Sequence, residues 1–385
     1  MPFLTDRMHD RQRQEKLAAA LSDENSGTAS RGDGRAGPVQ ALASRFSFDL
    51  QRIEDELRAS IIGQDEAIEQ VLEILKVVRV DIGDPRKPLA SVLFCGPTGV
   101  GKTETVRTIA RAMYGDADAF CRVDMNTLSQ EHYAAAITGA PPGYVGSKEG
   151  TTILDQEKIE GTRNLPGLVL FDELEKASNE VVLALMNVFD NGLLTVASGE
   201  RTYSFRNSLI FMSSNLGARE LMMLDERATG VRGLLSRMSG GGTKKRSERA
   251  HEIVMRSLLE RFPPELVNRI DHIDTFNWID SSKMPDLVDV ELQRLNRRLK
   301  KHGLWLEMSS DVRDFIALKG YDKRFGARGL RRSMRRYLEF PLAGYLLGDH
   351  GDFSPPEGSA IVKLSAEYRD DAVSFRQASE KGKDL

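Results

Sequence analysis

The chain of 385 residues has little cysteine, little net charge and no long apolar run. Two cysteines, Cys95 and Cys121, exclude a disulfide framework and fit a reducing compartment. Lys and Arg number 54 against 57 Asp and Glu, and the net charge of −3 excludes a globally basic nucleic-acid binder. The sequence contains no run of about 18 consecutive apolar residues, so no membrane span is expected. An N-terminus without an apolar signal segment makes the cytoplasm the expected compartment.

What is present fits a globular protein of about two domains, with 40% hydrophobic and 29% charged residues. Residues 1–45 include a Ser/Gly/Asp/Arg-rich stretch and are expected to form a disordered or partly helical tail. Beyond that tail, five apolar runs alternate mostly with helical patterns, which predicts a doubly wound parallel α/β sheet. The runs are Ser91–Cys95, Ala119–Val123, Leu168–Asp172, Leu209–Ser213 and His272–Phe276.

The pattern changes near residue 280, so we expect a large domain over 46–279 and a smaller one over 280–366. The smaller domain is predicted to be mainly helical, with strands at Leu304–Met308 and Ala360–Leu364. Asp311 is the expected N-cap of one of its helices. Residues 367–385 are predicted to be a C-terminal tail.

A phosphate-binding loop follows the first strand and opens a helix, the context that this motif requires. Its glycines allow backbone N–H groups to surround phosphate oxygens, and the helix N-terminus adds a favourable partial positive charge. Lys102 is expected to reach the β- and γ-phosphates, and Thr103 to offer its hydroxyl to Mg²⁺. The loop comprises Gly96, Pro97, Thr98, Gly99, Val100, Gly101, Lys102 and Thr103.

Two acids end the strand Leu168–Asp172, at the sheet edge where the phosphate loop also lies. Asp172 is expected to hold Mg²⁺, and Glu173 to polarise the water that attacks the γ-phosphate. Asn215 follows the next strand and could orient that water, although a turn-forming asparagine is the better interpretation from sequence alone. These features together predict hydrolysis of a nucleoside triphosphate.

At this point the chain resembles the Clp-type AAA+ ATPases, in particular the second ATPase module of the ClpA and ClpB unfoldases and disaggregases. The resemblance covers roughly residues 48–366, and its motifs keep the family's order and spacing. They are Ile62–Ala67, Gly96–Thr103, Gly139–Gly146, Phe171–Glu173, Ser213–Gly217, Pro264–Asp271 and Tyr321–Arg331.

The resemblance implies an αβα ATPase core with a helical lid, ATP and Mg²⁺ as ligands, and a homohexameric ring with ATP between subunits. It implies that Ile61 and Ile62 line the adenine pocket and that Asn215 senses the γ-phosphate. Arg269 looks like the arginine finger that reaches a neighbour's ATP, and Arg328 like the lid arginine that contacts ATP in cis. Without the resemblance, Arg269 would be interpreted as an ordinary surface charge.

The resemblance also implies that Gly143, Tyr144, Val145 and Gly146 form a pore loop whose aromatic side chain grips a threaded polypeptide. The alternative is an ordinary surface loop. Protein substrates are therefore expected, and the predicted function is an ATP-driven protein unfoldase or remodelling chaperone.

Several departures from the family keep alternatives open. The chain has one ATPase module, lacks the family's globular N-terminal domain and coiled-coil insertion, and has no Ile-Gly-Phe/Leu tripeptide within 219–249, so docking to a ClpP-type peptidase is doubtful. Substrate choice is then expected to come from residues 1–45, from 219–249 or from an adaptor. One alternative is a dedicated assembly or regulatory switch that acts on one partner complex, and a less favoured one is a nucleic-acid motor or loader.

Overall fold

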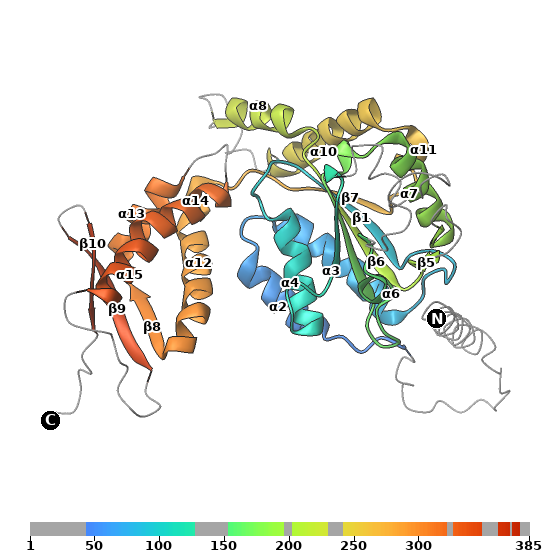
Figure 1. Ribbon diagram of the computed structural model, residues 1–385. Coiled ribbons are helices and arrows are strands. Elements are labelled where there is room, and N and C mark those ends of the chain that lie inside the picture. Colours follow the sequence, from blue (N-terminus) through green and yellow to red (C-terminus); the bar gives the residue numbers. More distant parts are fainter. Residues whose placement is uncertain are drawn as a thin grey trace, which may run out of the picture.

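The computed structural model describes residues 44–127, 153–195, 202–229, 242–321, 326–348, 361–369 and 372–377. Figure 1 shows two parts, a larger α/β domain and a smaller domain of helices with its own sheet. The larger domain is built on five parallel strands in the order β2-β3-β6-β1-β7. The predicted doubly wound fold is therefore confirmed. The strands are β1 (Ala90–Cys95), β2 (Cys121–Asp124), β3 (Gly167–Asp172), β6 (Ser208–Ser214) and β7 (His272–Thr275).

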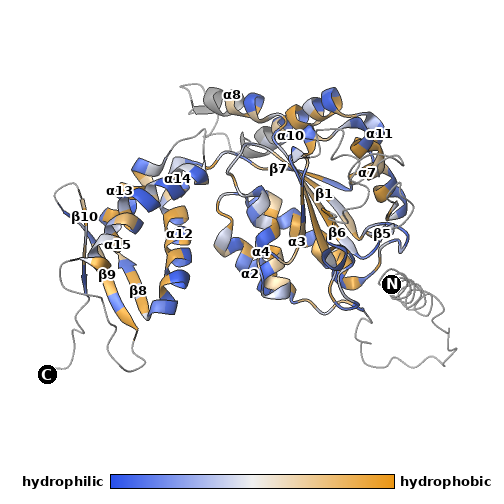
Figure 2. Cartoon of the chain, in the orientation of Figure 1, coloured by the Kyte–Doolittle hydropathy of each residue, from blue (hydrophilic) through white to orange (hydrophobic). Residues whose placement is uncertain are grey.

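The central strands β1, β3 and β6 are buried along their whole length because helices cover both faces of the sheet. Along β1, Val92 and Phe94 join one core, whereas Leu93 and Cys95 join the other. Figure 2 shows these strands mostly in the hydrophobic colour, with polar residues on the outer helix faces. The first core includes α2 (Leu50–Ser60), α3 (Asp65–Val80) and α4 (Lys102–Tyr114), and the second includes α6 (Gln156–Glu160), α7 (Asn179–Asn191) and α10 (Gly242–Arg261).

Shorter elements complete the larger domain. A 3-10 turn η2 (Leu174–Lys176) follows β3, a hairpin pairs β4 (Leu193–Thr195) with β5 (Thr202–Ser204), and α8 (Ala218–Thr229) follows β6. Helix α11 (Pro264–Val267) leads into β7, and η3 (Ser281–Lys283) precedes the smaller domain. Of the segment 219–249, helix α8 and the beginning of α10 are described. In the described part of the chain, no helix has the length and hydrophobicity of a membrane span.

The smaller domain packs its helices against a three-stranded sheet of order β10-β9-β8. Strands β8 (Leu304–Met308) and β9 (Val362–Arg369) are parallel, and β10 (Ala372–Gln377) runs antiparallel to β9. Its helices are α12 (Met284–Leu299), η4 (Lys300–His302), α13 (Ser310–Gly320) and α14 (Ala327–Met334), followed by a π-helical turn η5 (Arg335–Glu339) and α15 (Phe340–Leu347).

Two expectations for this domain were wrong. The expected tail 367–385 contains the end of β9 and all of β10, whose residue Val373 joins the hydrophobic core, so the domain continues to at least residue 377. The N-cap of α13 is Ser309 and not Asp311, because the Ser309 hydroxyl accepts a hydrogen bond from the Val312 N–H.

Candidate functional site

The phosphate loop joins β1 to α4, and three of its glycines have φ values that other residues rarely adopt. Gly96 has a φ of 139°, and a Cβ atom there would lie 2.2 Å from the carbonyl oxygen of Phe276. Gly101, with a φ of 119°, lies directly before the first residue of α4. The loop therefore brings backbone N–H groups and a helix N-terminus to one point at the carboxyl edge of the sheet.

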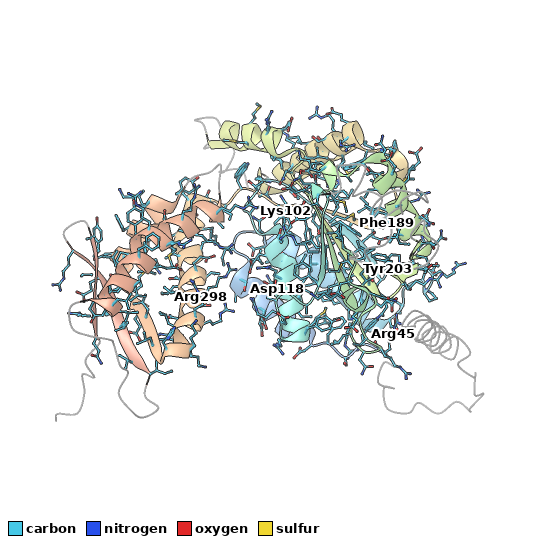
Figure 3. All side chains as sticks on the ribbon, viewed as in Figure 1. Arg45, Lys102, Asp118, Phe189, Tyr203 and Arg298 are labelled. Carbon is cyan, nitrogen blue, oxygen red and sulfur yellow. The ribbon has the colours of Figure 1, made fainter. Side chains whose placement is uncertain are left out.

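Lys102 is the first residue of α4, and its side chain is almost completely buried. Its Nζ donates hydrogen bonds to the carbonyl oxygens of Gly96 at 2.5 Å and Pro97 at 2.8 Å, and to Oδ1 of Asn215 at 3.0 Å. Burial lowers the pKa of Lys102 to about 8. An anion in the cavity would favour the charged ammonium, so this lysine is suited to binding phosphate. Figure 3 labels Lys102 on the side of the larger domain that faces the smaller one.

Asp172 ends β3 and is held from two sides. The Ser213 hydroxyl donates to its Oδ1, and the Arg122 guanidinium donates to its Oδ2 through Nε at 3.1 Å and through a terminal nitrogen at 2.6 Å. The sequence did not single out Arg122, which comes from the neighbouring strand β2. The carboxylate is thus fixed in orientation beside the phosphate loop.

Glu173 follows Asp172 in a left-handed backbone conformation, with φ 58° and ψ 50°. It is one of two non-glycine residues with positive φ in the described chain. Its N–H donates to the Ser213 hydroxyl at 3.2 Å. Such strain, of order 1–3 kcal/mol, is typical of functional positions, where the backbone aims a side chain into a site.

Asn215 lies just beyond β6, between Lys102 and a residue that the sequence did not indicate, Glu175. Its amide Nδ2 donates to Oε1 of Glu175 at 3.2 Å. The turn-forming interpretation of Asn215 therefore misses its contact with the phosphate-loop lysine.

Lys102, Asp172, Glu173 and Asn215 line one cavity of about 330 Å³ between the two domains. Besides the catalytic candidates, its lining includes apolar side chains, namely Ile61, Ile62, Ile279 from the end of the large domain, and Leu287 and Val290 from α12. Of the predicted residues, the cavity is lined by Ile61, Ile62, Thr98, Gly99, Val100, Gly101, Lys102, Thr103, Asp172, Glu173, Asn215 and Arg328.

The smaller domain closes the cavity by direct contact with the phosphate loop. The Ala327 N–H donates to the Gly99 carbonyl oxygen at 3.0 Å. Gly326, with a φ of 49°, lies so close that a Cβ atom would be 2.8 Å from that same oxygen. This contact places Arg328, in the first turn of α14, on the cavity wall.

A network of four charged side chains reinforces this closure. Arg294 on α12 bridges Glu104 on α4 at 2.6 Å and Glu291 on its own helix at 2.7 Å. Arg331 on α14 bridges Glu291 at 2.9 Å and Glu104 at 3.6 Å. Because its members come from three elements in two domains, no local sequence pattern indicates the network.

Arg269 lies apart from the cavity. Its Nε pairs with Oδ1 of Asp190 on α7 at 2.8 Å, and both side chains are partly exposed. The chain is anchored two residues later, where Asp271 Oδ2 accepts from the N–H and hydroxyl of Ser91, each at 2.7 Å. The structure therefore does not bring Arg269 together with the other predicted site residues of the same chain.

The remaining predicted residues, Gly143, Tyr144, Val145 and Gly146, lie outside the described part of the chain, as do residues 1–43. Within the part that is described, no cluster of three or more His, Cys, Asp or Glu residues is suited to a metal ion. A cation at this site would thus take some of its ligands from a bound phosphate.

A parallel sheet with a phosphate loop, two acids at the neighbouring strand end and a covering second domain defines a nucleoside-triphosphatase with a lid. Residues 87–273 match the family described as AAA domain (Cdc48 subfamily), and residues 279–361 match the C-terminal, D2-small domain, of ClpB protein. The chain belongs to the Clp-type AAA+ ATPases.

Individual relatives agree with this assignment. The chain is 55% identical over 366 residues to the ATP-dependent protease ATP-binding subunit-like protein AmiB of Pseudomonas aeruginosa, covering 95% of this chain and 97% of that protein. It is 37% identical to the chaperone protein ClpB of Rhizobium meliloti, over 86% of this chain and only 35% of ClpB. A closed-state structure of Hsp104 with ATPγS and FITC casein matches with a TM-score of 0.67 and 27% identity, over 85% of this chain and 51% of that chain.

Proposed function

We propose that the chain is an ATP-driven protein unfoldase or remodelling chaperone. It would act as a homohexameric ring that hydrolyses ATP between subunits and threads polypeptide through its pore. The observation that carries this proposal is the lid-covered cavity, which gathers Lys102, Asp172, Glu173, Asn215 and Arg328 but excludes Arg269. The expected arginine finger is thus not part of the cavity of its own chain, and a neighbouring subunit would supply it.

The described residues divide the chemistry among themselves. Phosphoryl transfer places negative charge on the γ-phosphoryl oxygens and on the leaving oxygen. Lys102 and Arg328 line the cavity as cations and would stabilise this charge. Glu173 would accept the proton of the attacking water, and Asn215 would hold that water or the γ-phosphate in place.

Magnesium binding rests on the oxygen donors beside the loop. Thr103 offers a hydroxyl and Asp172 a carboxylate, and Mg²⁺ in such sites takes a few protein oxygens together with phosphate and water. Both residues line the cavity, so the donor set fits this ion. Since Arg122 occupies one Asp172 oxygen, its guanidinium would share that carboxylate or move away.

The position of Arg269 supports the proposed assembly into a ring. Its partly exposed guanidinium, held by Asp190 at the surface, is suited to reach across an interface to a neighbour's ATP. An arginine supplied in this way makes hydrolysis depend on assembly. The named relatives support a protein substrate, because the Hsp104 structure contains FITC casein.

Tyr144 would grip the substrate with an aromatic face that contacts many side chains without selecting a sequence. The test uses a stable fluorescent protein with an unstructured tail and follows its ATP-dependent loss of fluorescence. Tyr144→Ala should stop unfolding while ATP hydrolysis continues, and Tyr144→Phe should unfold at near the wild-type rate. Normal unfolding by Tyr144→Ala would refute threading by this residue.

A dedicated switch that remodels one partner complex is the second candidate. It is favoured by AmiB, which this chain matches over 97% of its length, so that this relative contains a single ATPase module. Deleting residues 1–45 distinguishes the two, since a switch should lose its partner and keep basal ATP hydrolysis.

We place either activity in the cytoplasm, where the buried free thiols of Cys95 and Cys121 would stay reduced.

A further inference from the structure

Glu175 lies directly behind the candidate γ-phosphate sensor and is not one of the described residues that line the cavity. Its carboxylate accepts hydrogen bonds from the Ser214 hydroxyl at 2.8 Å and from Asn215 Nδ2 at 3.2 Å, and it lies 3.4 Å from the Asn215 backbone N–H. The sensor thus touches Glu175 on one side and Lys102 on the other.

These two neighbours determine which way the Asn215 amide points. The Lys102 ammonium can only donate hydrogen bonds, and the ionised Glu175 carboxylate can only accept them. Oδ1 of Asn215 therefore faces Lys102, and Nδ2 faces Glu175, as the distances of 3.0 and 3.2 Å show. If the amide flipped, both contacts would place like partners together, donor against donor and acceptor against acceptor.

The turn that carries Glu175 is itself held in place. Arg261 at the end of α10 donates from Nε to the Glu175 carbonyl oxygen at 3.0 Å and from a terminal nitrogen to the Ala177 carbonyl oxygen at 2.8 Å. These bonds hold the middle residue of the turn η2 and the residue that follows it. Glu175 is therefore a fixed acceptor, as a group that orients another side chain must be.

We propose that Glu175 is a positioning residue for ATP hydrolysis, acting through Asn215. This inference rests on the proposed function and deepens it. One N–H of Nδ2 binds Glu175, which leaves the second N–H for the γ-phosphate or the attacking water. Because phosphate oxygens are acceptors, an Asn215 amide that presented Oδ1 instead would repel them.

The test compares Glu175→Gln with Glu180→Gln, a matched exchange on the exposed first turn of α7. A glutamine at 175 can accept or donate, so it no longer determines the amide orientation. We expect Glu175→Gln to lower kcat about tenfold, the lower end of what loss of an orienting neighbour costs, with the affinity for a fluorescent ATP analogue unchanged. Glu180→Gln should match the wild type in both.

Two further variants separate positioning from a merely structural role. Glu175→Asp keeps the carboxylate and should retain more kcat than the isosteric Glu175→Gln, whereas a role based on side-chain length would reverse this order. In an Asn215→Ala background, Glu175→Gln should have no further effect on kcat, because the residue that it orients is gone. Additive losses would overturn the inference.

Failure of the inference is distinguishable from failure of the proposed function. If wild-type hydrolysis is abolished by Glu173→Gln but is normal in Glu175→Gln, only the role of Glu175 is refuted. If the wild-type chain does not hydrolyse ATP under any condition of assembly, both are refuted.

Discussion

Gly326 lies so close to the phosphate loop that replacing it with alanine should weaken ATP binding. Gly326→Ala would place a Cβ atom 2.8 Å from the Gly99 carbonyl oxygen, on a residue with φ 49° and ψ −136°. Backbone strain of this kind costs about 1–3 kcal/mol, and overpacking adds about 1–3 kcal/mol. The lid can escape that cost only by moving away, which breaks the hydrogen bond from Ala327 to Gly99.

Either response disturbs the cavity wall that carries Arg328. A loss of about 1.4 kcal/mol in binding is already a tenfold change in Kd, so we expect Gly326→Ala to weaken ATP binding at least tenfold. Fluorescence titration with an ATP analogue measures this change. The matched control is Gly344→Ala within α15, where an added Cβ meets no heavy atom within 4 Å. This control should bind ATP normally and be up to about 1 kcal/mol more stable. Wild-type affinity in Gly326→Ala would refute the direct contact between lid and loop.

Three further predictions concern stability, each measured by urea denaturation. Burial raises the pKa of Asp274 from 3.8 to about 7. This group therefore stabilises the fold below about pH 4, and that contribution to the free energy of unfolding, on the order of 4 kcal/mol, is lost as the pH rises to 7. Asp274→Asn should abolish this pH dependence. A pH profile unchanged in Asp274→Asn would contradict this. Arg294→Ala should cost about 1–3 kcal/mol and weaken ATP binding, because it leaves Glu104 and Glu291 partly buried with one remaining cation; an unchanged midpoint would contradict the network. Arg269→Ala should cost no more than about 1 kcal/mol, since its ion pair with Asp190 is partly exposed. A larger loss would mean that any effect of Arg269→Ala on hydrolysis reflects unfolding.

The sequence predicted the parts of the fold whose residues follow a local pattern. Strands such as Leu168–Asp172 have a continuous apolar run, here Leu168–Phe171, because both faces are buried. The motif Gly96–Thr103 requires its strand, loop and helix together. Strand β10 was missed because only one face of this edge strand is buried, so that Val373 and Phe375 alternate with polar residues in a short segment. The cap of α13 was misplaced by two residues, since both Ser309 and Asp311 are good capping types.

The site residues also differ in whether a local pattern contains them. Lys102, Asp172 and Glu173 belong to local motifs and were all predicted. Arg122 and Glu175 were missed because they reach the site only through strand pairing and a turn that α10 holds in place. A sequence pattern cannot indicate such contacts, since the partners are about 40 to 90 positions apart along the chain.

In the proposed mechanism, hydrolysis occurs between subunits, with Arg269 supplied by a neighbour. The direct measurement is the ATP hydrolysis rate of an equal mixture of Arg269→Ala and Glu173→Gln chains. Each variant alone should be inactive, whereas in mixed rings a chain with intact Glu173 can meet a neighbour with intact Arg269. We predict recovery to about a quarter of the wild-type rate, the share of interfaces that random mixing completes. A mixture no faster than either variant alone would contradict hydrolysis between subunits.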